Sequence, residues 1–147
     1  MVKMDIEIEI LLVEDNANDE ELAIIALKKH NIKNKIKIAR DGVEALEYLF
    51  GSVDSETLKC FGPLVVLLDL KLPRINGLEV LRRIKSHPEA KKIPVVILTS
   101  SSEEKDIIES YQLGANSYIR KPVDFNQFTE AVNQIGLYWL VLNKQSC

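Results

Sequence analysis

Two short segments, at residues 64–68 and 93–98, constrain the fold of this chain more than any other feature. The first is Leu-Val-Val-Leu-Leu and the second is Ile-Pro-Val-Val-Ile-Leu. A strand that is apolar along its whole length is covered on both faces, which is typical of parallel sheets flanked by helices. These two segments therefore predict the buried centre of a parallel sheet.

The rest of the chain alternates between strand and helix patterns. Further strands are predicted at 6–13, 35–39 and 117–119, the second of them an edge strand with one wet face. Helices are predicted after a cap at Asn16 or Asn18, at 43–50, from 78, at 103–113 and from a cap at Asp124. Because five strands alternate with five helices, short right-handed crossovers produce an open parallel α/β sheet with helices on both faces.

Two of the helices carry additional local signals. In the first, Leu22, Ile25 and Ala26 recur at helical spacing behind an acidic first turn. The helix at 103–113 is followed by Gly114, at the position where helices favour a left-handed residue.

Length, charge and cysteine content narrow the class of protein. A chain of 147 residues is predicted to form a single domain, 1–147. Its 19 Lys and Arg against 22 Asp and Glu argue against a dedicated nucleic-acid binder. Two cysteines make no disulfide framework, the N-terminus lacks the apolar stretch of a signal peptide, and no run reaches the roughly 18–20 apolar residues that span a bilayer. A cytoplasmic protein that binds neither nucleic acid nor membrane is expected.

Polar side chains follow four of the five predicted strands. They are Glu14 and Asp15 after the first strand, Asp69 after the third, Thr99 after the fourth and Lys121 after the fifth. Ligands of open parallel sheets bind beyond the carboxyl ends of the strands, so these residues are expected to converge. Each acid taken singly also fits a helix cap or a turn. The convergence of all five at one edge is what favours a functional site.

The chemistry of such a group follows from its charges. Carboxylates packed closely raise one another's pKa unless a cation lies between them. Clustered oxygen ligands suit a hard cation, Mg²⁺ before Ca²⁺. A carboxylate beside Mg²⁺ and a lysine ammonium is suited to attack a phosphoryl group and form an acyl phosphate. The residues therefore predict a magnesium site that accepts a phosphoryl group.

Four ordered motifs covering residues 6 to about 135 resemble the response-regulator receiver domain. They are Leu-Leu-Val-Glu14-Asp15-Asn, Leu-Leu-Asp69-Leu-Lys-Leu-Pro73-Arg-Ile-Asn76-Gly77, Leu-Thr99-Ser100-Ser and Leu-Gly-Ala-Asn-Ser-Tyr118-Ile-Arg-Lys121-Pro122. Each motif is weak alone, and together they are highly specific. The resemblance implies a flavodoxin-like sheet with strand order 2-1-3-4-5.

The resemblance also implies roles for the acidic residues. Asp69 would accept the phosphoryl group from a phosphohistidine on a sensor histidine kinase. Glu14, Asp15, Asp69 and the backbone carbonyl of Lys71 would hold Mg²⁺, although the family more often has Asp at the position of Glu14. Lys71 and Ser101 occupy positions that tune self-dephosphorylation. On this view the chain is not an enzyme but a phosphoacceptor that assists its own phosphorylation and dephosphorylation.

Three further residues match the switch machinery of the family. Lys121 would pair with the phosphoryl oxygens, and Thr99 would hydrogen-bond to them once they arrive. Tyr118 matches the aromatic switch that turns inward as Thr99 moves. The alternative for Tyr118 is an ordinary half-buried aromatic in a short edge strand.

The output of the protein is expected to be contact with other proteins. Only about two dozen residues follow Asp124, which favours a stand-alone receiver with one last helix at about 124–142. That helix carries apolar residues on its second side, at Leu137, Tyr138, Leu140 and Val141, which predicts a homodimer or kinase interface. The stretches 31–34, 41–46 and 121–125 are similar to the stand-alone regulators that partner bacterial and cyanobacterial phytochromes.

Three other classes of protein are alternatives to a receiver domain. A dehalogenase-type phosphatase needs a second Asp two residues after the first, where this chain has Lys71. A flavin carrier needs a hydroxyl-rich phosphate loop, where Glu14 and Asp15 would repel the phosphate. The remaining alternative is a pseudo-receiver, an interaction module that takes no phosphate, although all the residues required for phosphate acceptance are present.

Overall fold

The computed structural model describes residues 9–28, 35–59, 61–62, 64–100, 104–121, 124, 126–127 and 130. Within these residues five parallel strands form one sheet in the order β2-β1-β3-β4-β5. The strands are β1 (Glu9–Val13), β2 (Lys35–Ala39), β3 (Leu64–Asp69), β4 (Val95–Thr99) and β5 (Ser117–Arg120). The helices are α1 (Ala17–Lys28), α2 (Gly42–Phe50), α3 (Gly77–Ser86) and α4 (Glu104–Gln112), with a 3₁₀ turn η1 (Ala90–Lys92). The predicted α/β class, parallel sheet and strand order are confirmed.

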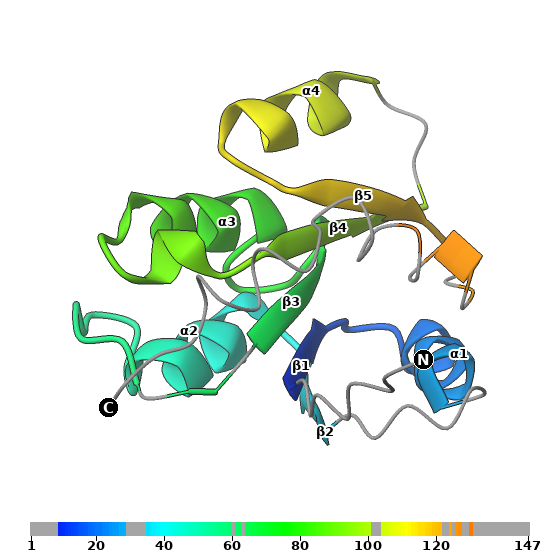
Figure 1. Cartoon of the computed structure of the whole chain (residues 1–147), viewed down its shortest axis with the longest axis horizontal. Helices are drawn as coiled ribbons and strands as arrows, with labels where there is room; N and C mark the ends of the chain where they lie inside the picture. The colour runs from blue at the N-terminus through cyan, green and yellow to red at the C-terminus, as the bar shows by residue number, and fades with distance from the viewer. Residues whose placement is uncertain are drawn as a thin grey trace, which may run out of the picture.

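Helices cover the two faces of the sheet unequally among the described residues. Helix α1 lies on one face, and α2 and α3 lie on the other, while α4 runs beside β5 (Figure 1). Alternate residues of each central strand feed two separate cores, because successive side chains of a strand point to opposite faces. In β1, Leu11 and Val13 join the core under α2 and α3, whereas Ile10 and Leu12 join the core under α1.

The central and edge strands have the burial that their sequences predict. All six residues of β3 are buried, as expected for a strand covered on both faces. Lys35 and Lys37 of β2 are exposed, so this edge strand has the predicted wet face. Strand β4 begins at Val95, two residues later than the apolar run, because Ile93 ends the 3₁₀ turn and Pro94 has no N–H to donate.

The cap of α1 is Asn16 rather than Asn18. The Asn16 Oδ1 atom accepts hydrogen bonds from the backbone N–H groups of Asn18 (2.9 Å) and Asp19 (3.0 Å). Of the residues at helical spacing, Ala26 is buried, but Leu22 and Ile25 are 46% and 55% exposed. Residues 22–27 are apolar without interruption, so spacing alone does not decide which side of this helix meets the sheet.

Two other predicted helix ends are present. Gly114 follows α4 with a φ of +104°, the left-handed conformation expected of it. Asp124 accepts a hydrogen bond from the backbone N–H of Gln127 (2.7 Å), which is the contact of a capping carboxylate. Apart from residues 126–127 and 130, the rest of the predicted helix at 124–142 lies outside the described residues, as do its apolar second side and Ser101. No helix in the described part of the chain is long and apolar enough to cross a bilayer.

The start of α3 is packed directly against the end of β3. Asn76 caps α3 by accepting from the Glu79 N–H (2.9 Å), and the Gly77 N–H donates to the Leu70 carbonyl (2.9 Å). A Cβ on Gly77 would lie 2.2 Å from the Asp69 carbonyl oxygen and 2.6 Å from the Leu70 Cα. Helix α3 can therefore approach the carboxyl end of β3 only because residue 77 has no side chain.

Gly77→Ala is expected to lower the free energy of unfolding by about 2–3 kcal/mol, because the backbone around Asp69 must move to admit the methyl group. Urea unfolding followed by circular dichroism measures the change. Gly62→Ala is the matched control, since nothing lies within 4 Å of a Cβ placed at Gly62. Equal unfolding midpoints for the two variants would contradict the expectation.

Candidate functional site

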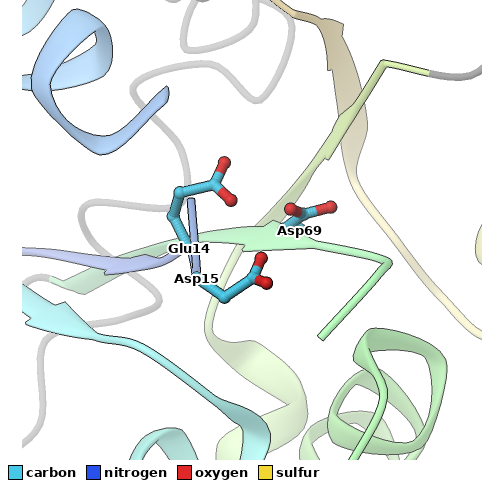
Figure 2. A group of neighbouring side chains, drawn as sticks. All are labelled: Glu14, Asp15 and Asp69. Atoms are coloured by element: carbon cyan, nitrogen blue, oxygen red, sulfur yellow. The ribbon is translucent and has the colours of Figure 1, made fainter. Parts of the chain in front are cut away.

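Three carboxylates meet where β1 and β3 end. Strands β1 and β3 are neighbours with Val13 opposite Leu68, so Glu14 and Asp69 leave the sheet at the same level. Figure 2 shows Glu14, Asp15 and Asp69 grouped at this edge, and one oxygen from each lies within 4.8 Å of the others. Glu14 and Asp69 are buried and Asp15 is exposed. The structure thus brings together the three acids that the strand-end argument selected.

Lys121 joins the group from the end of β5. Its backbone N–H donates to the Thr99 carbonyl (2.8 Å), which fixes its position beside the end of β4. Its ammonium donates to Asp69 Oδ2 (2.8 Å) and forms an ion pair with Glu14 Oε1. Only 9% of the Lys121 side chain is exposed, so this ammonium is held in the interior of the site.

Asp19 is a fourth acid at the site that the sequence analysis did not select. Its Oδ2 atom accepts a hydrogen bond from the Lys121 ammonium at 3.1 Å. An acidic first turn by itself fits the usual preference for negative charge at a helix N-terminus, so it does not single out Asp19. The sequence did carry a signal, because Asp19 lies in the first turn of α1, a helix that begins only two residues after Asp15.

The carboxylate of Asp69 is oriented from two sides. Its Oδ1 atom accepts from the backbone N–H of Lys71 (3.1 Å), and its Oδ2 atom accepts from Lys121. The Lys71 side chain is exposed. This places the Lys71 backbone, the predicted source of a carbonyl ligand, next to the three carboxylates.

The two predicted switch residues lie on neighbouring strands, β4 and β5, and differ in burial. Thr99 is buried at the end of β4, one residue beyond the pairing of Asp69 with Leu98. Tyr118 pairs with Ile97 in the sheet and is 45% exposed. Its ring makes an edge contact with that of Tyr111 on α4, with centroids 6.1 Å apart. Tyr118 therefore points toward α4 and solvent in this structure rather than toward Thr99.

The electrostatics of the site indicate a shortage of positive charge. Burial raises the pKa of Glu14 to about 7, and the neighbouring Asp69 adds to this shift while Lys121 opposes it. Burial alone would lower the pKa of Lys121, but its hydrogen bonds to Asp69, Glu14 and Asp19 outweigh burial and raise that pKa. One ammonium is shared among several acids, so a further cation would stabilise their ionised forms. The donor set of Glu14, Asp15 and Asp69 consists of carboxylate oxygens, which fits a hard divalent cation.

This fold and this group of residues define a known class of signalling domain. A family model described as the response regulator receiver domain matches residues 10–133. The chain belongs to this family, whose members are the receivers of two-component systems.

Several relatives resemble the chain over nearly its full length. It is 40% identical to response regulator Rcp1 from Synechocystis sp. over 131 aligned residues. The alignment covers 89% of this chain and 88% of Rcp1. The structure of the bacteriophytochrome response regulator AtBRR is 49% identical with a TM-score of 0.77, covering 92% of this chain and 97% of AtBRR. The structure of phosphorylated RcpA, a cyanobacterial phytochrome response regulator, is 39% identical with a TM-score of 0.71, covering 93% of this chain and 96% of that one.

Rcp1 is also known in an Mn²⁺-bound form, whose structure is 36% identical with a TM-score of 0.70 and covers 94% of this chain and 99% of that one. The close homologues of this chain are thus stand-alone phytochrome response regulators.

Proposed function

We propose that this protein is a phosphoacceptor that takes a phosphoryl group on Asp69 and transmits the change by contact with another protein. The observation that carries the proposal is the Asp69 carboxylate held between the Lys71 N–H and the Lys121 ammonium, beside two further acids. A carboxylate fixed in this way is positioned as a nucleophile, and the ammonium beside it can offset the charge of the incoming group.

In the proposed reaction an Asp69 oxygen attacks the phosphorus of a phosphohistidine on the donor kinase. The new O–P bond forms as the P–N bond breaks, and the imidazole leaves with the electron pair of that bond. Glu14, Asp15, Asp69 and the Lys71 carbonyl are the residues proposed to hold Mg²⁺. When bound, Mg²⁺ supplies positive charge that offsets the negative charge of the transferring group.

The chain's own residues then hold the product. Lys121 already donates a hydrogen bond to Asp69 Oδ2, and it is proposed to pair with the phosphoryl oxygens. Thr99, buried at the end of the neighbouring strand, is proposed to donate its hydroxyl to the same oxygens. A shift of Thr99 would open space beside β5 for the Tyr118 ring, which leaves its contact with Tyr111. Phosphorylation would thereby reshape the surface of α4 and β5.

The partners are proposed from the relatives. AtBRR and RcpA are named for bacteriophytochrome and phytochrome signalling, which supports a phytochrome-type histidine kinase as the phosphoryl donor for this chain.

We further propose that residues 1–147 act as a single, cytoplasmic receiver domain and that residues 124–142 form a homodimer contact. Changing Leu140 and Tyr138 to Ser should then reduce the sedimentation mass, and an unchanged mass would argue against the dimer.

The proposed function is tested by incubating the protein with acetyl phosphate, with Mg²⁺ or with a chelator. The intact mass is expected to rise by one phosphoryl group only when Mg²⁺ is present. Borohydride reduction followed by peptide mapping should then convert residue 69 to homoserine, because an aspartyl phosphate is reduced where a free carboxylate is not. If no phosphoryl group is gained under any condition, the pseudo-receiver alternative is favoured instead.

A further inference from the structure

The ammonium of Lys121 contacts three carboxylates at once. They come from three different elements: Glu14 after β1, Asp19 in the first turn of α1 and Asp69 at the end of β3. Lys121 donates hydrogen bonds to Asp19 and Asp69, and its contact with Glu14 is an ion pair. A phosphoryl group on Asp69 would therefore have to draw this ammonium away from carboxylates that already hold it.

Asp19 differs from the other two partners of Lys121 because it has no other role in the proposed reaction. Asp69 is the residue that becomes modified, and Glu14 is one of the three acids placed to hold a metal ion. Asp19 is outside that group of three. It keeps its carboxylate free to hold Lys121 before and after the reaction.

The position of Asp19 is fixed by the start of its helix. Its backbone N–H donates to the Asn16 side chain (3.0 Å), and the backbone N–H of Asn16 donates to Glu14 Oε2 (3.3 Å). The Asp19 side chain is 32% exposed, so its charge is partly screened by solvent, unlike that of the buried Glu14. None of these contacts involves a residue of β3.

The charges at the site give the sign of the effect. Three carboxylates, those of Glu14, Asp19 and Asp69, contact one ammonium. The carboxylate of Asp15 lies beside Glu14 and Asp69 and adds a fourth negative charge. A phosphoryl group exchanges the single negative charge of Asp69 for a charge of up to about −2. Asp19 adds a negative charge next to that group and also takes a share of the cation that should neutralise it.

We propose that Asp19 is a positioning residue that competes with the phosphoryl group for Lys121 and so weakens the phosphoryl-bound state. This inference rests on the proposed function, because it requires that Asp69 accept a phosphoryl group beside Mg²⁺. Asp19 stabilises the unmodified site by holding the ammonium. It makes the phosphorylated site less stable than the same site would be without the Asp19 charge.

The test uses trifluoroberyllate, a tetrahedral mimic of an aspartyl phosphate, on the full chain at saturating Mg²⁺. Asp19→Asn keeps the size of the side chain and an oxygen that can accept from Lys121, but removes the charge. It is expected to bind trifluoroberyllate about three- to tenfold more tightly than the wild-type protein, as followed by fluorine NMR. Affinity for Mg²⁺ alone should stay equal or fall, because removing a negative charge cannot help a cation to bind.

Glu21→Gln is the matched control. Glu21 is an exposed carboxylate two residues further along α1, so this variant removes one negative charge from the same helix without touching Lys121. It is expected to leave trifluoroberyllate affinity unchanged. If Glu21→Gln tightened binding as much as Asp19→Asn did, the effect would be one of overall charge and the proposal would be wrong.

The remaining outcomes separate this proposal from the proposed function. Equal or weaker trifluoroberyllate binding by Asp19→Asn, with normal binding by the wild-type protein, would overturn the role of Asp19 and leave phosphoryl acceptance intact. Parallel losses of trifluoroberyllate affinity, Mg²⁺ affinity and stability would show that Asp19 is merely structural. Failure of the wild-type protein to bind trifluoroberyllate and to gain a phosphoryl group would overturn the proposed function and this inference together.

Discussion

Asp69→Asn is expected to abolish phosphoryl gain from acetyl phosphate while leaving the fold in place. The amide has no carboxylate oxygen with which to attack phosphorus, so the mass increase should fall below detection. Affinity for Mg²⁺ should fall by about tenfold or more, because one of three clustered anionic ligands is lost.

The stability of Asp69→Asn should change little. Removing the Asp69 charge relieves its repulsion with Glu14, which favours the folded state. Against this, Lys71 and Lys121 donate to different oxygens of Asp69, and the amide keeps only one of these two acceptors. These effects oppose one another, so in metal-free buffer the free energy of unfolding is expected to stay within about 1 kcal/mol of the wild-type value.

Intact-mass spectrometry, Mg²⁺ titration and urea unfolding measure the three effects in one variant. Asp54→Asn is the matched control, because Asp54 is an exposed acid in the loop after α2. It should gain the phosphoryl group normally. A phosphoryl group that still appeared on Asp69→Asn would place the acceptor at another residue.

Lys121→Met is expected to cause the largest loss of stability, about 3–5 kcal/mol in metal-free buffer at pH 8, because it removes the cation from a buried group of acids. Glu14 and Asp69 would then face each other without a counter-charge. Mg²⁺ should restore part of the loss, since an ion that binds the folded state stabilises it by mass action.

The loss in Lys121→Met should depend on pH, with a sign that follows from Glu14. The pKa of Glu14 is already raised to about 7 by burial and by Asp69, and removal of Lys121 takes away the group that lowers it. Consider a carboxyl group whose pKa is higher in the folded state than in the unfolded state. At any pH between those two pKa values, the folded state binds more protons than the unfolded state. Stability therefore falls as the pH rises through that range. The deficit of the variant should accordingly be smaller at pH 5 than at pH 8.

Urea unfolding of Lys121→Met at the two pH values, with and without Mg²⁺, measures these effects. Lys92→Met is a control for the loss of one positive charge, because Lys92 is exposed at the end of η1. It should be close to wild type at both pH values. A deficit in Lys121→Met that was independent of both pH and Mg²⁺ would mean that Lys121 acts by packing rather than by charge.

Much of the fold could be predicted because the signals that specify it are local. The unbroken apolar runs in β3 and β4 require burial on both faces, and alternation of strands with helices then requires parallel pairing. The strand order is a different matter. Periodicity does not say on which side of the existing strands each new strand is added, and the order was predicted only through the resemblance to receiver domains.

Most of the candidate site could likewise be predicted from strand positions. Once the strands are parallel, the residues that end β1, β3 and β4 must share one edge of the sheet, so Glu14, Asp15, Asp69 and Thr99 could be selected from their positions alone. Lys121 could be added by the same rule after β5.

Which helix residues join this group, and which face of α1 is buried, depend on how the elements pack together. Asp19 reaches Lys121 because the cap at Asn16 sets the rotation of α1, and Lys121 lies more than a hundred residues away in the chain. The same rotation buries Ala23 and Leu27 and leaves Leu22 and Ile25 in solvent. A helix whose apolar residues run without a gap has no preferred side until the sheet and the cap orient it, which is why local pattern could not supply this part of the answer.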